Sequence, residues 1–128
     1  MMAFAAEFDP QPMHLDEVAA RAAMTGGLCA SGWYACSIMM RMMADAFVLN
    51  SSSMGAPGVD EVKWLLPIRP DDEIRLRATV MDVRVSKSRP DMGFVNFHFE
   101  LFNAAGQRVM TLTTALMLGR RDPASAAP

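Results

Sequence analysis

The stretch GGLCASGWYACSIMMRMMADAFVLN, residues 26–50, decides the fold. It is the longest apolar segment of the chain, and its only charges are Arg41 and Asp45. These two residues are four apart and are therefore neighbours on a helix surface. A helix that is apolar nearly all round is usually buried inside a larger structure. We therefore predict a core helix over residues 31–48, with a sheet wrapped around it.

This apolar segment does not fit a membrane span. Its uncharged part, residues 26–40, is shorter than the ~20 residues that cross a bilayer, and two charges follow it. The Gly-Gly and Ser-Gly pairs at its front instead allow another element to approach the backbone closely. The whole chain has 128 residues, which suits one domain with an ordinary core.

The overall charge argues against nucleic acid and anionic membranes as partners. The net charge is −2 and the pI is about 5.6, so the chain lacks the basic surface that such partners require. Cys29 and Cys36 are seven residues apart, and we expect both on one face of the core helix as free thiols. Free thiols, and an N-terminus without the features of a signal peptide, predict a cytoplasmic protein.

The sequence pattern changes after the core helix, where a loop rich in turn residues leads into four segments with strand character. These segments are residues 59–68, 73–86, 94–102 and 108–118. In the second of them the apolar alternation changes phase after Val80, which predicts a bulge near Met81 and Asp82. That segment would be ~46 Å long if straight, so we expect it to curve around another element.

Helices that precede about four antiparallel strands indicate an α+β domain with helices on one face of a sheet. Long curved strands around one buried helix are typical of a hot-dog fold. We expect this single domain to cover residues 1–119, followed by a flexible tail over residues 120–128. A four-stranded sheet has exposed edges, which proteins usually cover or pair. The pattern therefore predicts a homodimer in which two sheets join edge to edge.

Asp9 and His14 are an acid and an imidazole on one short loop, which Pro10 and Pro12 stiffen. An Asp beside a His can orient the ring and balance its charge, and His suits proton transfer near neutral pH. This spacing can point both side chains into one pocket. Alternatively, Asp9 caps a turn and His14 caps the helix that follows.

Three segments resemble the MaoC-like hydratase family, the hot-dog (R)-specific enoyl-CoA hydratases. They are FDPQPMHLDEVAA, GGLCASGW and GAPGVDEVKWLLPIRPDDEI, and the resemblance covers nearly the whole chain. The hydratase motif of the family is Asp-x-Asn-Pro-x-His. Asp9, Pro12 and His14 match it, whereas Gln11 replaces the Asn and Phe8 replaces a preceding Gly. The resemblance implies that Asp9 and His14 are the catalytic pair that activates water for addition to a trans-2-enoyl thioester.

The same resemblance implies where the substrate binds. Ser37 falls five residues after Gly32, where some hydratases of the family have a pocket serine. Gly58 and Val59 lie about where a backbone N–H would polarise the thioester carbonyl. The implied substrate-binding residues are Gln11, Met13, Gly32, Ser37, Gly58 and Val59. The implied substrate is an acyl-CoA or acyl-carrier thioester, so coenzyme A enters as part of the substrate, and neither a separate cofactor nor a metal is expected. A first strand that the family usually has is missing before Phe4.

Two other functions remain open. A hot-dog thioesterase would need an acid on or near the core helix, and Asp45 stands at its far end, where a pair with Arg41 is expected. A non-catalytic acyl-thioester binder or partner subunit could have the same fold. A nucleophilic role for Ser31 or Ser37 is discounted, because neither has a His or an acid at a suitable spacing. The Asp9/His14 pair favours the hydratase.

Overall fold

The computed structural model describes residues 1–121, in which the helices precede a four-stranded sheet. The helical elements are α1 (Met2–Phe8), the 3-10 turn η1 (Pro12–His14), α2 (Glu17–Ala22), α3 (Gly32–Ala46) and the 3-10 turn η2 (Val48–Asn50). The strands are β1 (Glu61–Trp64), β2 (Arg75–Val85), β3 (Met92–Phe102) and β4 (Arg108–Gly119). The predicted order of elements is confirmed.

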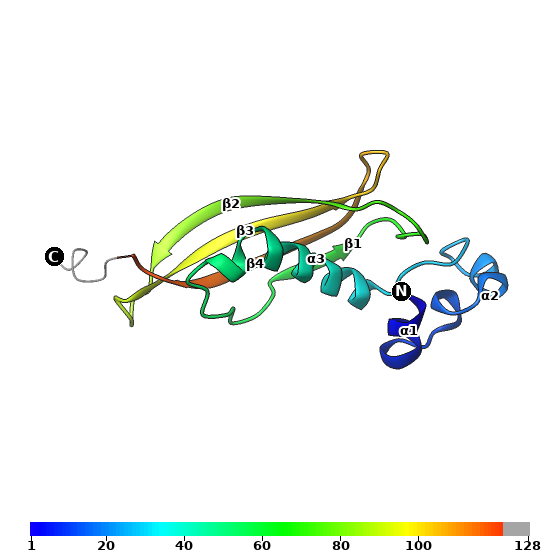
Figure 1. The fold of residues 1–128 in the computed structure, drawn as a ribbon, viewed down its shortest axis with the longest axis horizontal. Coiled ribbons are helices and arrows are strands. Elements are labelled where there is room, and N and C mark those ends of the chain that lie inside the picture. Colours follow the sequence, from blue (N-terminus) through cyan, green and yellow to red (C-terminus); the bar gives the residue numbers. More distant parts are fainter. Residues whose placement is uncertain (122–128) are drawn as a thin grey trace.

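The sheet is antiparallel throughout, with strand order β1-β4-β3-β2. The long strands β2, β3 and β4 curve, and α3 runs along one face of the sheet (Figure 1). The two short helices α1 and α2 lie together beyond the N-terminal end of α3 (Figure 1). This is the predicted α+β architecture of a curved sheet wrapped around a central helix.

The central helix begins where the sequence predicts. Ser31 is its N-cap, and the Ser31 hydroxyl oxygen accepts a hydrogen bond from the Trp33 N–H at 3.2 Å. Arg41 and Asp45 form the expected pair on the exposed face, with Nε of the arginine 3.1 Å from a carboxylate oxygen. The α-helix ends two residues earlier than predicted, because the chain tightens into η2.

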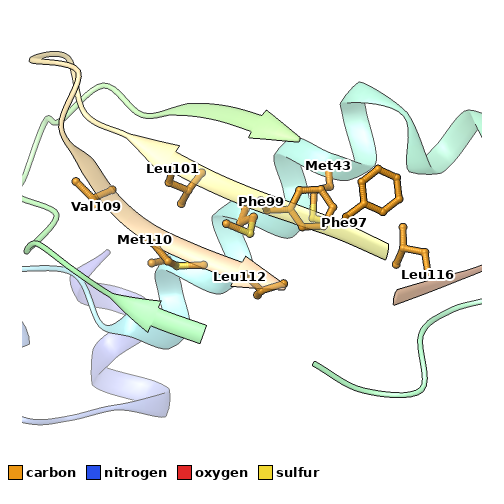
Figure 2. Close-up of a cluster of buried hydrophobic side chains, with 10 residues drawn as sticks. Met43, Phe97, Phe99, Leu101, Val109, Met110, Leu112 and Leu116 are labelled. Atoms are coloured by element: carbon orange, nitrogen blue, oxygen red, sulfur yellow. The ribbon is translucent and has the colours of Figure 1, made fainter. Parts of the chain in front are cut away.

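The core lies between α3 and the concave face of the sheet. Ala35, Met39 and Met43 of α3 are buried against side chains of β3 and β4 (Figure 2). These strand residues are Phe97, Phe99, Leu101, Val109, Met110, Leu112 and Leu116. Burying an aliphatic or aromatic side chain of this size contributes about 1.5–3 kcal/mol, so this cluster fixes the helix on the sheet.

The burial of α3 is less complete than its composition predicts. Trp33 and Met40 are 61% and 48% exposed, on the side of the helix away from the cluster. A single four-stranded sheet covers one face of a helix, so the apolar residues on the other face stay in contact with solvent in one chain.

The predicted bulge in the second strand is confirmed. Val80 pairs with Phe97 and Asp82 pairs with Asn96, so Met81 is the extra residue of β2.

Strand β1 is much shorter than predicted. The N–H groups of Leu65 and Leu66 both point to the carbonyl of Val109, so the ladder already breaks two residues before Pro67.

The chain beyond β4 continues along the turn between β2 and β3. The Arg120 N–H donates to the carbonyl of Asp91 at 2.9 Å, and its guanidinium donates to the carbonyl of Pro90 at 2.8 Å. The first residue of the expected tail is therefore bound to the domain, and residues 122–128 lie outside the described residues. Among the described helices, none has both the length and the hydropathy needed to cross a membrane.

Candidate active site

A cavity of about 400 Å³ opens where the N-terminal helices, the start of α3 and the end of β1 meet. Its polar side chains come from the loop that follows α1 and from the segment between α2 and α3. Its apolar wall comes from α3, β1 and β4. The lining residues include Asp9, Gln11, Met13, His14, Thr25 and Cys29 on the polar side and Gly32, Trp33, Trp64, Leu65 and Met110 opposite. The cavity therefore joins a polar end to an apolar wall.

The proline-containing loop brings Asp9 and His14 together. Asp9 is the C-cap of α1, and the following turn is closed by the Gln11 N–H, which donates to the Asp9 carbonyl at 2.8 Å. Pro12 then starts η1, whose last residue is His14. As a result, Nε2 of His14 lies 3.4 Å from Oδ2 of Asp9, at the wall of the cavity.

His14 is buried, and a main-chain contact fixes its ring. Its Nδ1 lies 2.8 Å from the carbonyl oxygen of Cys29. A carbonyl only accepts hydrogen bonds, so Nδ1 must be protonated and donate. In the neutral imidazole Nε2 is then the unprotonated nitrogen, and it faces Asp9. The Cys29 thiol, also buried, lies 3.6 Å from Nδ1.

Two donors hold the Asp9 carboxylate. The hydroxyl of Ser31 donates to Oδ2 at 2.6 Å, and the side-chain amide of Gln11 donates to Oδ1 at 2.7 Å. These hydrogen bonds, Ser31 first and Gln11 second, lower the pKa of Asp9 below its ordinary value of 3.8, whereas partial burial opposes them. The nearby His14 lowers the pKa further. Asp9 is therefore an ionised acceptor at neutral pH.

Gly32, the first residue of α3, lies against the indole of Trp64. Trp64 Nε1–H donates to the Gly32 carbonyl at 3.1 Å, and the ring occupies the space that a β-carbon on Gly32 would fill. The N–H groups of a first helical turn have no partner within the helix. Ser31 accepts from the Trp33 N–H, and no acceptor for the Gly32 N–H lies within the described residues. A free backbone donor thus stands at the edge of the cavity, at the positive end of a helix dipole.

The structure brings five of the sequence-predicted residues to this cavity and leaves three outside it. Those at the cavity are Asp9, Gln11, Met13, His14 and Gly32. Ser37 is exposed, and its hydroxyl donates to the Trp33 carbonyl one helical turn earlier at 2.9 Å. Gly58 and Val59 are exposed on a loop, where the Gly58 carbonyl accepts from Thr114 at 2.6 Å. In this chain none of these three lines the cavity.

Sequence reasoning missed Ser31, Cys29 and Trp64. Cys29 was expected on the core helix in line with Cys36, which is wrong: it lies before α3, in an extended segment that the Ala30 N–H ties to the Ile68 carbonyl at 2.9 Å. Ser31 could have been found as an N-cap serine immediately before the helical glycine. Its contact to Asp9 spans 22 residues of sequence, so no local pattern reveals it.

Comparison with known proteins defines the family. The model of the MaoC-like domain matches residues 1–96, which is most of the chain. The protein therefore belongs to the MaoC-like domain family, and the fold predicted from the resemblance is confirmed.

Three relatives illustrate the range of similarity. The crystal structure of a MaoC-like dehydratase from Rhodospirillum rubrum is 41% identical, with a TM-score of 0.87 over 94% of this chain and 82% of that chain. The uncharacterised Bacillus subtilis protein YdeM is 25% identical over 120 residues, which are 94% of this chain and 84% of YdeM. An unliganded (R)-hydratase from Pseudomonas aeruginosa is 18% identical and shares the fold, with a TM-score of 0.70 over 94% of this chain and 72% of that chain.

Proposed function

We propose that this protein is a hydro-lyase that adds water to a trans-2-enoyl thioester or removes it in the reverse direction. The observation that supports this most directly is the pair formed by Asp9 and His14 at the cavity wall, 3.4 Å apart. The family of the chain and its 41% identity to a protein described as a MaoC-like dehydratase point to the same class of reaction.

The pair is suited to hold and activate one water molecule. With Nδ1 of His14 protonated, Nε2 and the Asp9 Oδ2 are both acceptors, and a water can donate one hydrogen to each. The water oxygen then attacks the β-carbon of the enoyl group while the pair accepts one proton. The pair returns one proton to the α-carbon, so that H and OH are added across the double bond. General acid–base steps of this kind typically contribute 10²–10⁴-fold.

The thioester carbonyl gains negative charge during this addition and needs a donor. We assign that role to the Gly32 N–H, which stands free at the N-terminus of α3, beside the cavity. This assignment replaces the sequence-based expectation for Gly58 and Val59, which lie outside the cavity in this chain. The apolar wall around Trp33, Trp64 and Leu65 would then face the acyl group, which coenzyme A or an acyl carrier protein delivers.

We also propose that the protein works as a homodimer. Strand β2 is one edge of the sheet, and its apolar side chains are unusually open to solvent. Val80, Val83 and Val85 are 54%, 68% and 50% exposed. An exposed edge of this length favours pairing with a second copy.

Cys29 and Cys36 are free thiols, which supports a reducing, cytoplasmic location.

The test is to follow the loss of conjugation of crotonyl-CoA and a longer trans-2-enoyl-CoA by absorbance, with free thiol measured in parallel. We expect hydration without thiol release by the wild type, and about 10²–10⁴-fold lower kcat/KM for His14→Ala and for Asp9→Asn. His98→Ala is the matched control, because His98 lies in β3, contacts Thr113 at 3.3 Å and does not line the cavity.

Thiol release with an intact double bond would instead identify a thioesterase. That outcome is disfavoured, because Asp45, the acid on α3, is exposed and pairs with Arg41. A folded protein that binds but does not turn over either substrate would contradict the hydratase proposal for these substrates and point to a binding subunit. Equal losses for His98→Ala and His14→Ala would remove the basis for assigning the reaction to this loop.

A further inference from the structure

Ser31 is completely buried and contacts both the start of α3 and the Asp9 carboxylate. Its hydroxyl oxygen accepts from the Trp33 N–H at 3.2 Å, and its hydrogen points to Oδ2 of Asp9 at 2.6 Å. A serine hydroxyl has one hydrogen to donate. Because the main chain occupies an acceptor site of the oxygen, the geometry directs that single hydrogen to Asp9.

The same Oδ2 atom is the one that faces His14, at 3.4 Å from Nε2. Ser31 therefore occupies one lone pair of the oxygen that the proposed water would use, and Gln11 holds the other carboxylate oxygen at 2.7 Å. The carboxylate is clamped at both ends, and the remaining lone pair of Oδ2 is left for a ligand in the cavity.

We infer that Ser31 is a positioning residue that fixes the Asp9 carboxylate against His14 and ties the catalytic loop to the N-terminus of α3. This role rests on the proposed hydratase function, and it assigns to one hydroxyl the alignment of Asp9 and the capping of the helix that presents the Gly32 N–H. A displacement of either would change the distance between the water and the substrate carbonyl, and small misplacements reduce the rate strongly.

The experiment compares Ser31→Ala with Ser31→Gly. Both variants remove the hydroxyl, but glycine at an N-cap destabilises a helix less than alanine does, so the loss of helix stability can be separated from the loss of Asp9 alignment. We expect both to lower kcat about 10- to 100-fold, as for loss of one hydrogen bond to a charged group, with KM little changed. Ser51→Ala is the control, because the Ser51 hydroxyl caps a turn at the other end of α3.

A second readout does not depend on turnover. The carboxyl carbon of Asp9, followed by NMR against pH, is expected to titrate at higher pH in both Ser31 variants than in the wild type and in Ser51→Ala. The titratable groups that line the cavity beside Asp9 within the described residues are His14 and Cys29, so the titration is also recorded in a Cys29→Ala background. An unchanged Asp9 titration in both Ser31 variants would reduce Ser31 to a helix cap and overturn the inference. If the wild type shows no hydration, the titration still decides the role of Ser31, and only the proposed function fails.

Discussion

The indole of Trp64 packs directly against the backbone of Gly32: Trp64 Nε1–H donates to the Gly32 carbonyl at 3.1 Å, and ring atoms occupy the space that a β-carbon on Gly32 would fill. The contact joins the end of β1 to the first residue of α3. It also forms the corner of the cavity at which the thioester carbonyl is proposed to bind. Any side chain at position 32 would therefore disturb the fold and the site together.

Gly32→Ala is expected to destabilise the protein by about 1–3 kcal/mol, because its β-carbon would lie 2.7 Å from Cδ2 of the Trp64 ring. Urea unfolding measures this cost in the wild type and in a Trp64→Val background. In that background the clash is relieved, so we expect a coupling of about 0.5–3 kcal/mol between the two substitutions. An equal cost of Gly32→Ala in both backgrounds would show that the clash with Trp64 is not its cause.

The ionised Asp9 is expected to make the stability of the protein depend on pH in acid. Its pKa is lowered in the folded state by the hydrogen bonds from Ser31 and Gln11, so folding favours the charged form. The resulting stabilisation is present above the ordinary value of 3.8 and is lost as the pH falls through the lowered folded-state pKa. The Asp9→Asn variant has no ionisable carboxyl at this position and therefore lacks this pH-dependent stabilisation.

Denaturant unfolding of the wild type and Asp9→Asn from pH 6 downwards tests this expectation. The difference in unfolding free energy between the two proteins should shrink as the pH is lowered below the ordinary Asp value. A difference that grows towards acid pH would mean that folding raises the Asp9 pKa, in conflict with the two donors seen in the structure.

Arg69 is expected to stabilise residues 25–28, the loop that precedes Cys29, whose carbonyl oxygen accepts the hydrogen bond from His14. Its guanidinium donates to the carbonyls of Gly27 at 2.7 Å and Leu28 at 3.3 Å, and also to that of Thr25. Arg69→Ala leaves these carbonyls without their charged partner, and we expect a loss of about 1.5–3 kcal/mol, measured by thermal or urea unfolding. Arg69→Lys should recover only part of it, because the ammonium is a compact point charge and lacks the planar fork of donors with which the guanidinium reaches these carbonyls.

Arg21→Ala is the matched control for this prediction. Arg21 forms an exposed pair with Glu17 on α2 at 3.1 Å, and such pairs contribute little. We expect its unfolding free energy to stay within about 0.5 kcal/mol of the wild type. If Arg69→Ala changed the unfolding free energy as little as Arg21→Ala, other contacts would hold the backbone of residues 25–28. The hydrogen bonds from Arg69 to these carbonyls would then contribute nothing measurable to stability.

Val83→Glu is expected to weaken the proposed dimer. Val83 is 68% exposed near the C-terminal end of the edge strand β2, and a charge there opposes edge-to-edge pairing of two copies. Sedimentation velocity across a concentration series should show a larger monomer fraction, with unchanged circular dichroism. Val18→Glu on α2, where the valine is 77% exposed, should leave the distribution as in the wild type. A wild type that remains monomeric at every concentration would contradict the homodimer itself.

Local patterns predict much of this fold. The apolar run and its Ser-Gly start define α3, and the phase change after Val80 reveals the bulge at Met81, because strand alternation has a period of two and any insertion is visible. The segment 59–68 was predicted too long, because the end of β1 depends on where β4 stops offering carbonyls, which is a property of another strand.

The candidate site was predictable only as far as one loop contains it. Asp9, Gln11 and His14 are within six residues, and two prolines restrict the backbone between them. Ser31 and Trp64 reach the site through the packing of distant elements, and sequence spacing does not reveal such contacts. The expectation for Gly58 and Val59 came from resemblance alone, and their loop lies elsewhere in this chain.

The acceptor that fixes the His14 ring is a carbonyl of the main chain, not a side chain. Every amino acid at position 29 supplies the same carbonyl oxygen. A substitution there therefore does not change which nitrogen of the imidazole carries the proton. It is determined by the path of the backbone, which Arg69 and the bond between Ala30 and Ile68 maintain. Sequence drift at position 29 is thereby tolerated by the chemistry, whereas a one-residue insertion or deletion between positions 25 and 30 would abolish the ring's alignment at once.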